Sequence, residues 1–240
     1  MRSSPFSTKS VVLLDAGGTL ITLDYERIRG VTARAGLRPA DGDFDREEAR
    51  ARRWASGEAA RGASAEDLWA GYFMRMLTGV GVEAVDAPRL IDRLWEVHRE
   101  HGLWRRPIEG AVDACRKLLD RGWRLGVVSN AEGQVEADLN AAGFDGLFET
   151  VVDSHRVGCA KPHSRIFEIA FERMGIEADE ALYVGDVPAF DVEGARAAGM
   201  PAVLIDSQRL YEDLDVPRID SLIELPEILG NASRSTPESR

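Results

Sequence analysis

The chain has 240 residues, 44% hydrophobic and 30% charged, which are the proportions of a soluble globular protein of one or two domains. Its formal net charge of −11 argues against nucleic acid or an anionic membrane as the main partner, because both attract a positive protein face. No apolar run approaches the roughly 18 residues of a membrane helix, and the run Val11–Leu14 is too short for a secretory signal. We therefore expect a cytoplasmic protein.

Hydrophobic periodicity divides the chain into three stretches. The apolar run at 10–15 predicts a buried parallel strand that ends at Asp15 and breaks into a Gly-Gly loop. From about residue 24 to 102 the apolar residues recur at three- and four-residue spacing, which predicts helices only. After Pro107, short apolar runs alternate with amphipathic segments. These predict strands at 123–129, 149–153, 181–185 and 201–205, and helices at 111–120, 132–142, 163–174 and 191–198.

Strand–helix units of this length predict an α/β fold with a parallel sheet and helices on both faces. The long helical insertion after the first strand predicts a second lobe. Ligands of such sheets bind at the carboxyl ends of the strands.

Three of the predicted strands end in reactive groups, namely Asp15, Ser129 and Asp186. Two carboxylates facing each other across strand ends repel unless a cation lies between them, and hard oxygen ligands favour Mg²⁺. Lys161 precedes a predicted helix, and an ammonium, a hydroxyl and free backbone N–H groups suit a phosphate. Each residue alone has an ordinary structural explanation, so the signal is their shared location.

Four short motifs, in order, resemble those of the haloacid dehalogenase (HAD) superfamily, and the resemblance extends from residue 10 to about 229. The motifs are Asp15-Ala-Gly-Gly-Thr19, Ser129-Asn130, Lys161-Pro162, and Gly185-Asp186 followed by Asp191. The resemblance implies a Rossmann-like core made of residues 1–21 and 106–240. It also implies an α-helical cap domain, residues 22–105, inserted after the first motif.

The resemblance further implies a covalent mechanism, which divides one difficult displacement into two easier ones. Asp15 would be the nucleophile, and Thr19 and Ser129 would hydrogen-bond around the transferring group. Lys161 would offset the negative charge, and Asn130 would bind substrate together with Ser129 and Lys161. The implied substrate is a small anionic molecule that carries a phosphoryl group.

The same resemblance implies a Mg²⁺ site. Asp186 would hold the ion together with the Asp15 carboxylate and the backbone carbonyl of Gly17. Asp191 would orient Lys161 or the surroundings of the metal. A bound cation of this kind neutralises charge as the phosphoryl group moves.

Residue 17 departs from the family pattern. Typical phosphatases of the superfamily carry a second aspartate two residues after the nucleophile, as general acid and base, whereas this chain has Gly17. General acid–base catalysis contributes about 10²–10⁴-fold, so alkyl phosphates are expected to react slowly. Asp24, Tyr25 and Glu26 are the cap residues nearest in sequence that could supply an acid.

Two alternatives to a phosphatase remain open. A 2-haloacid dehalogenase needs no acid, but it usually has a tyrosine at the position of Gly17, and without a metal Asp186 would repel the substrate carboxylate. A non-catalytic HAD-like binding protein would also lack the acid. Phosphonate-cleaving relatives need a cap lysine for a Schiff base; residues 22–105 contain none, and arginine cannot replace it.

Two other features are expected to be structural. Cys115 and Cys159 make no disulfide framework. His98 and His101 lie one helical turn apart with no third ligand nearby, and we expect them on a solvated helix face.

Overall fold

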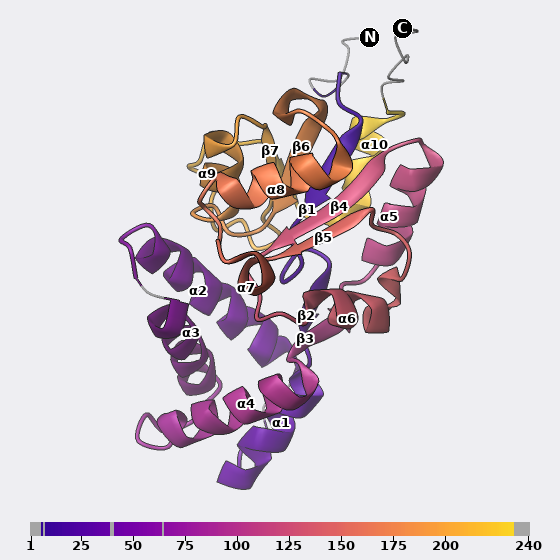
Figure 1. Cartoon of the computed structure of the whole chain (residues 1–240). Coiled ribbons are helices and arrows are strands. Elements are labelled where there is room, and N and C mark those ends of the chain that lie inside the picture. The colour runs from indigo at the N-terminus through magenta and orange to yellow at the C-terminus, as the bar shows by residue number, and fades with distance from the viewer. Residues whose placement is uncertain (1–5, 7, 39–40, 64, 233–240) are drawn as a thin grey trace, which may run out of the picture. The chain divides into compact units, whose positions relative to one another are not determined.

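The structure is a computed structural model that describes residues 6, 8–38, 41–63 and 65–232 (Figure 1). The chain divides into two compact units. Unit 1 comprises Met1–Thr22 and Arg106–Arg240, and unit 2 comprises Leu23–Arg105. Within the described residues, no helix combines the length and the apolar character needed to cross a membrane.

Unit 1 is built on a six-stranded parallel sheet with the strand order β5-β4-β1-β6-β7-β8. The strands, from one edge to the other, are β5 (Thr150–Asp153), β4 (Arg124–Ser129), β1 (Val11–Leu14), β6 (Ala181–Gly185), β7 (Ala202–Ile205) and β8 (Arg218–Ile219). In the centre, Leu14 pairs with Val127 of β4 and Val184 of β6. Every residue of β1 and β6 is buried, as expected for parallel strands covered on both faces.

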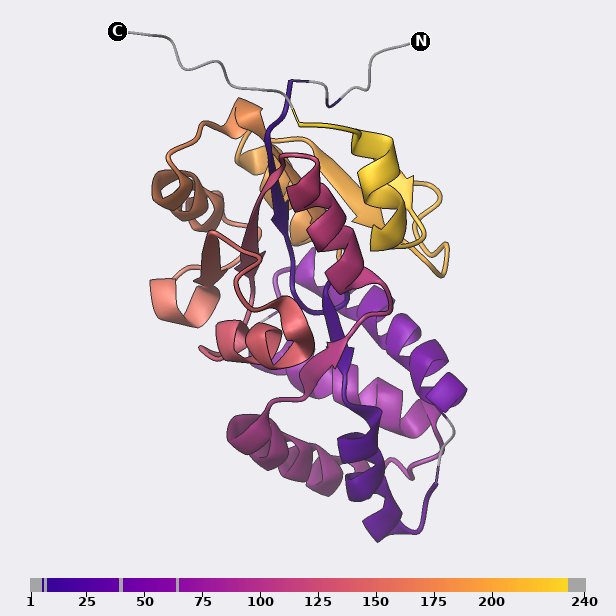
Figure 2. The same ribbon diagram turned by 90° about the vertical axis from the view of Figure 1, so that its right-hand side faces the viewer.

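Helices cover both faces of this sheet, which confirms the predicted α/β fold (Figures 1 and 2). Helix α8 (Arg165–Met174) packs on β4 and β5, and α9 (Asp191–Ala197) packs on β6 and β7. On the other side lie α5 (Ala111–Asp120) and α10 (Leu225–Leu229). A buried hydrophobic cluster of unit 1 includes Phe167 of α8.

Several short elements differ from the periodicity-based prediction. The segment predicted as a helix over 132–142 contains α6 (Val135–Leu139), followed by a wider turn at Asn140–Phe144 that ends around Gly143 at φ 93°. Strands β8 and β2 (Ile21–Leu23) were not predicted, because two or three residues are too few to show a pattern, and β3 (Trp104–Pro107) was not predicted, because its two arginines interrupt any apolar run. β2 and β3 pair with each other where the chain enters and leaves unit 2.

Unit 2 is helical, as the spacing of its apolar residues predicts. Its α-helices in the described residues are α1 (Tyr25–Thr32), α2 (Asp41–Ala59), α3 (Ala65–Gly79) and α4 (Ala87–His101). Its core also holds the buried carboxylate of Glu48, which accepts hydrogen bonds from the hydroxyls of Tyr25 (2.8 Å) and Tyr72 (3.0 Å). Arg52 forms an ion pair with the same carboxylate at 3.2 Å.

The expectation of a solvated His98 is wrong, whereas His101 is exposed. His98 lies four residues after Leu94, on the buried stripe of α4, and its Nδ1 accepts a hydrogen bond from the backbone N–H of Leu103 at 3.2 Å. Its ring lies 5.7 Å from that of Trp104. The apolar spacing along α4 was the available signal for this burial.

Candidate active site

Four charged side chains lie together at the carboxyl ends of the central strands. Asp15 follows β1, Asp186 follows β6, Asp191 begins α9, and Lys161 lies in the loop before α8. Their exposed fractions are only 7%, 2%, 1% and 4%, respectively. Charged groups are seldom buried to this extent unless they are paired or bind ions, so this cluster needs a physical explanation.

Lys161 donates hydrogen bonds to Asp191 and Tyr183 and forms an ion pair with Asp15. Its Nζ lies 2.8 Å from Asp15 Oδ1, 2.7 Å from Asp191 Oδ1 and 2.9 Å from the hydroxyl of Tyr183. Burial alone lowers the pKa of Lys161, but the carboxylates of Asp15 and Asp191 outweigh it, and the net pKa is raised. The ammonium therefore stays charged at neutral pH.

Asp191 uses both carboxylate oxygens inside the protein. While Oδ1 contacts Lys161, Oδ2 accepts hydrogen bonds from the backbone N–H groups of Asp186 (2.9 Å) and Val187 (2.8 Å). Gly185 permits this close approach, since a Cβ there would lie 2.3 Å from the Asp191 carboxyl carbon. Asp191 thus fixes both Lys161 and the loop that carries Asp186.

The cluster has the donor set of a divalent cation site. Oxygen atoms of Asp15, Asp186 and Asp191 all lie within 4.8 Å of one another. Three buried carboxyl groups gather around one ammonium, and burial raises the pKa of Asp15 despite the opposing effect of Lys161. Since Asp191 is engaged by three N–H donors, Asp15 and Asp186 are the carboxylates best suited to hold a cation.

Gly18 lies directly against the Asp186 carboxylate. Its φ is +81°, and a Cβ on it would fall 2.3 Å from Asp186 Oδ2. The loop after β1 therefore requires glycine at this position for two reasons, the backbone conformation and the space.

We expect Gly18→Ala to lower the free energy of unfolding by about 1–2 kcal/mol through backbone strain, and also to displace Asp186 and weaken cation binding. Gly175→Ala is the matched control, because Gly175 also has a positive φ (+63°) but has open space around it. Chemical denaturation and calorimetric titration with Mg²⁺ measure the two effects. If Gly18→Ala binds the cation as tightly as Gly175→Ala does, the inferred contact with Asp186 has no importance for the site.

The other residues predicted for the site lie around this cluster. The Thr19 hydroxyl is fully buried and has no hydrogen-bond partner among the described residues, and Ser129 is the buried last residue of β4. Asn130 exchanges two hydrogen bonds with the backbone of Lys161, from Nδ2 to the carbonyl (3.0 Å) and from the N–H to Oδ1 (2.8 Å). These two hydrogen bonds of Asn130 support the Lys161 loop, and its binding of substrate stays a prediction. Gly17 lies in the loop after β1 without a positive φ.

Two polar residues of this region were missed from the sequence. Tyr183 is fully buried in β6 and contacts Lys161, and its only signal was a hydroxyl within an apolar strand. Asp153 ends β5 and accepts hydrogen bonds from the backbone N–H groups of Gly133 (2.9 Å) and His155 (3.0 Å). It shapes the loop after β4.

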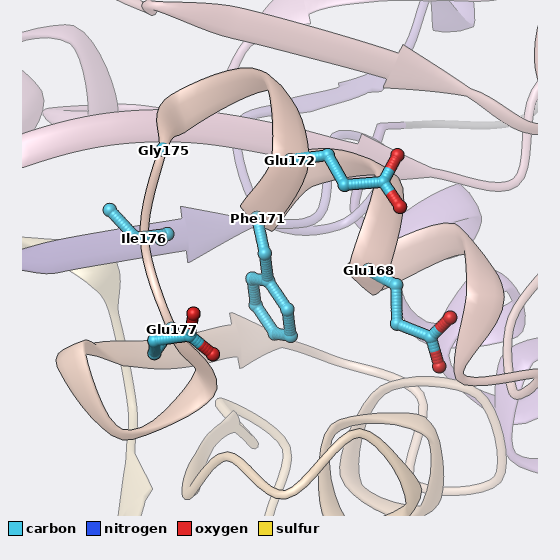
Figure 3. Close-up of a pocket in the computed structure, with 6 residues that line it drawn as sticks. All are labelled: Glu168, Phe171, Glu172, Gly175, Ile176 and Glu177. Atoms are coloured by element: carbon cyan, nitrogen blue, oxygen red, sulfur yellow. The ribbon is translucent and has the colours of Figure 1, made fainter.

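A separate pocket of about 360 Å³ lies on α8 and the segment after it (Figure 3). It is lined by Glu168, Phe171, Glu172, Gly175, Ile176 and Glu177. The pocket lies near the amino ends of the strands, since Arg124 at the start of β4 donates a hydrogen bond to the carbonyl of Met174, next to Gly175. It shares no residue with the carboxylate–lysine cluster. The pocket lining has three glutamates and no cationic side chain, whereas the cluster contains Lys161 beside carboxyl groups spaced for a cation, so the cluster is the better candidate active site.

Comparisons with known proteins agree with this fold and motif order. The family model of the haloacid dehalogenase-like hydrolases matches residues 9–199. The chain is 36% identical over 133 residues to a glyceraldehyde 3-phosphate phosphatase of Methanothermobacter thermautotrophicus, covering 52% of this chain and 59% of the relative. It is 33% identical over 158 residues to a phosphoserine phosphatase of Thermus thermophilus, covering 63% and 62%.

The solved structure of the putative HAD-hydrolase YfnB from Bacillus subtilis superposes with a TM-score of 0.67 at 22% identity, over 92% of this chain and 99% of that one. At this identity the match shows the shared fold. The two curated relatives are matched over about three fifths of their own length. The family model, in contrast, extends over most of the chain and includes all four motifs. The chain belongs to the haloacid dehalogenase-like hydrolases.

Proposed function

We propose that this chain is a Mg²⁺-dependent phosphatase that acts on a small phosphorylated metabolite through a covalent intermediate on Asp15. The observation that carries the proposal is the buried cluster in which Asp15 lies 2.8 Å from the Lys161 ammonium and beside Asp186. Relatives named as phosphatases of glyceraldehyde 3-phosphate and phosphoserine support the reaction class. A cytoplasmic location stays a prediction.

In the first step, an oxygen of the Asp15 carboxylate attacks phosphorus, and the bond between phosphorus and the leaving oxygen breaks. The leaving oxygen keeps the electron pair and takes up a proton. In the second step, water attacks phosphorus, the aspartyl-phosphate bond breaks, and phosphate departs with the Asp15 carboxylate restored. One water is consumed for each ester cleaved.

The neighbouring residues have separable tasks. Lys161 offsets the negative charge that gathers as the Asp15 carboxylate approaches the phosphoryl group. Thr19 and Ser129 donate hydrogen bonds to phosphoryl oxygens, which would give the buried Thr19 hydroxyl a partner. Asp191 keeps Lys161 and the Asp186 loop in place.

Asp15, Asp186 and the carbonyl of Gly17 would hold Mg²⁺, which fits the clustering of the carboxyl oxygens of Asp15, Asp186 and Asp191 within 4.8 Å of one another. When bound, the ion supplies Lewis-acid neutralisation of the phosphoryl oxygens and of the nucleophile. We further propose that unit 2 acts as the cap and contributes to substrate selectivity.

Asp186→Ala is expected to weaken Mg²⁺ binding by more than about tenfold, since it removes one of two ionised ligands from the site. Asp206→Ala is the matched control, because Asp206 is also buried beyond a strand end, lies outside the cluster, and accepts hydrogen bonds from the backbone N–H groups of Leu210 and Tyr211. Isothermal titration calorimetry compares both variants with the wild type. Equal Mg²⁺ affinity in the wild type and Asp186→Ala would remove the main support for the cation site.

A screen of phosphorylated metabolites, with and without Mg²⁺, tests the function, with a panel of 2-haloacids run beside it. The proposal predicts phosphate release that depends on Mg²⁺ and stops with EDTA. Halide release from 2-haloacids without phosphate release would identify a dehalogenase. Ligand binding without either product would identify a non-catalytic member of the family.

A further inference from the structure

Tyr183 is a polar residue in an otherwise apolar, fully buried strand. It is the middle residue of β6, and its hydroxyl donates to the backbone carbonyl of Val128 on β4 at 2.7 Å. The central strand β1 lies between these two strands. The hydroxyl therefore reaches across the strand that carries Asp15 at its end.

The direction of these hydrogen bonds assigns a role to the hydroxyl. A phenol has one proton, and a carbonyl can only accept, so the Tyr183 proton is committed to Val128. The contact of 2.9 Å with Lys161 must therefore run from the ammonium to the phenol oxygen. Tyr183 is the one uncharged acceptor among the three that surround Lys161.

We propose that Tyr183 is a positioning residue that orients the Lys161 ammonium toward Asp15. With two carboxylates alone, the ammonium could turn about its bond to Cε and share its protons unevenly between them. The phenol oxygen accepts a hydrogen bond from the ammonium and thereby fixes its rotation about the bond to Cε. The effect on catalysis rests on the proposed function, whereas the orientation of Lys161 by Tyr183 does not depend on it.

The ring of Tyr183 has a separate function from its hydroxyl. It packs edge-on against Phe167, with ring centroids 5.1 Å apart, and its centroid lies 5.4 Å from Lys161 Nζ. Tyr183→Phe keeps both ring contacts and removes the hydroxyl, with its hydrogen bonds to Val128 and Lys161 and its interaction with Asp191. The variant therefore isolates the proposed role.

We expect Tyr183→Phe to lower kcat by about 10- to 100-fold, the range of one hydrogen bond to a charged group, while KM changes by less than about threefold. The effect falls on kcat because the hydroxyl contacts Lys161 and not the substrate. Tyr72→Phe is the matched control, since it also removes a phenol hydroxyl that donates a hydrogen bond to a charged group, here the buried carboxylate of Glu48 in unit 2. Thermal melting of both variants measures the stability loss that removal of such a hydroxyl causes.

A second measurement does not need activity. The chain has three lysines, Lys9, Lys117 and Lys161, so labelling lysine with ¹³C at Cε yields three resolvable sets of NMR signals, assigned by Lys161→Arg. Tyr183→Phe is expected to shift the Lys161 signals and leave those of Lys9 and Lys117 in place. Tyr72→Phe is expected to shift none of them.

Unmoved Lys161 signals, or a kcat within twofold of the wild type, would overturn the proposal. A Tyr183→Phe chain that does not fold would also overturn it, because the hydroxyl would then serve stability. If the wild type cleaves no phosphate ester, the proposed function fails. In that case the lysine signals alone decide whether Tyr183 orients Lys161.

Discussion

Asp15→Asn is expected to abolish turnover and to leave the fold intact. The amide has nearly the shape of the carboxylate, but its oxygen is a poor nucleophile, so no aspartyl ester forms. Removing the nucleophile from covalent enzymes costs about 10⁴-fold or more in kcat. Phosphate release by purified wild type and variant, with circular dichroism as the check on folding, measures the loss.

Asp206→Asn is the control for this change, because it makes the same substitution at a buried strand-end aspartate outside the cluster. It should keep activity close to that of the wild type. Wild-type activity in a well-folded Asp15→Asn chain would show that the nucleophile lies elsewhere.

Gly17→Asp is expected to raise the turnover of alkyl phosphates, by up to about 10²–10⁴-fold. With glycine at this position, the leaving oxygen receives no proton from residue 17, so the wild-type rate should depend steeply on the pKa of the leaving group. Aryl and acyl phosphates should react measurably and sugar phosphates much more slowly. The carboxyl group of the variant would protonate the leaving oxygen and flatten this dependence. Because Gly17 does not have a positive φ, an aspartate there meets no left-handed backbone strain.

Gly17→Asn is the matched control for the second prediction, since it has the size of aspartate but no acidic proton. Rates for a series of aryl phosphates of graded leaving-group pKa distinguish the three proteins. A flat dependence in the wild type would point to an acid elsewhere, and Asp24 and Tyr25 would be the first residues to mutate. If Gly17→Asn raised the turnover of alkyl phosphates as much as Gly17→Asp does, residue 17 would act through its size and not through proton transfer.

The main elements of unit 1 were predictable because each strand is a short apolar run that ends in a polar residue. The run before Asp15 and the run before Asp186 both have this form, and parallel strands bring their carboxyl ends to one edge. Strands of two or three residues, such as β2 and β8, show no periodicity and were missed. The helix expected over 132–142 begins later, at Val135, and changes to a wider turn at Asn140, differences that the apolar periodicity does not reveal.

The candidate site was predictable in its membership but not in its contacts. The order of the motifs identifies Lys161 and Asp191. The structure adds that Asp191 also accepts a hydrogen bond from the backbone N–H of Asp186. Tyr183 was not predicted, because a tyrosine in a buried strand is ordinarily explained by packing. The two hydrogen bonds of Asn130 with the backbone of Lys161 were also not predicted, and its binding of substrate stays a prediction.

Trapping the covalent intermediate tests the proposed chemistry most directly. The wild-type chain is mixed with an aryl phosphate and Mg²⁺, quenched in acid within the first turnover, digested, and mapped by mass spectrometry. We expect one phosphoryl group on the peptide that contains Asp15, and accumulation of this species, because Gly17 also leaves the hydrolytic water without a base. Phosphate release with no phosphoryl group on Asp15, or with the group on another residue, would contradict the proposed mechanism.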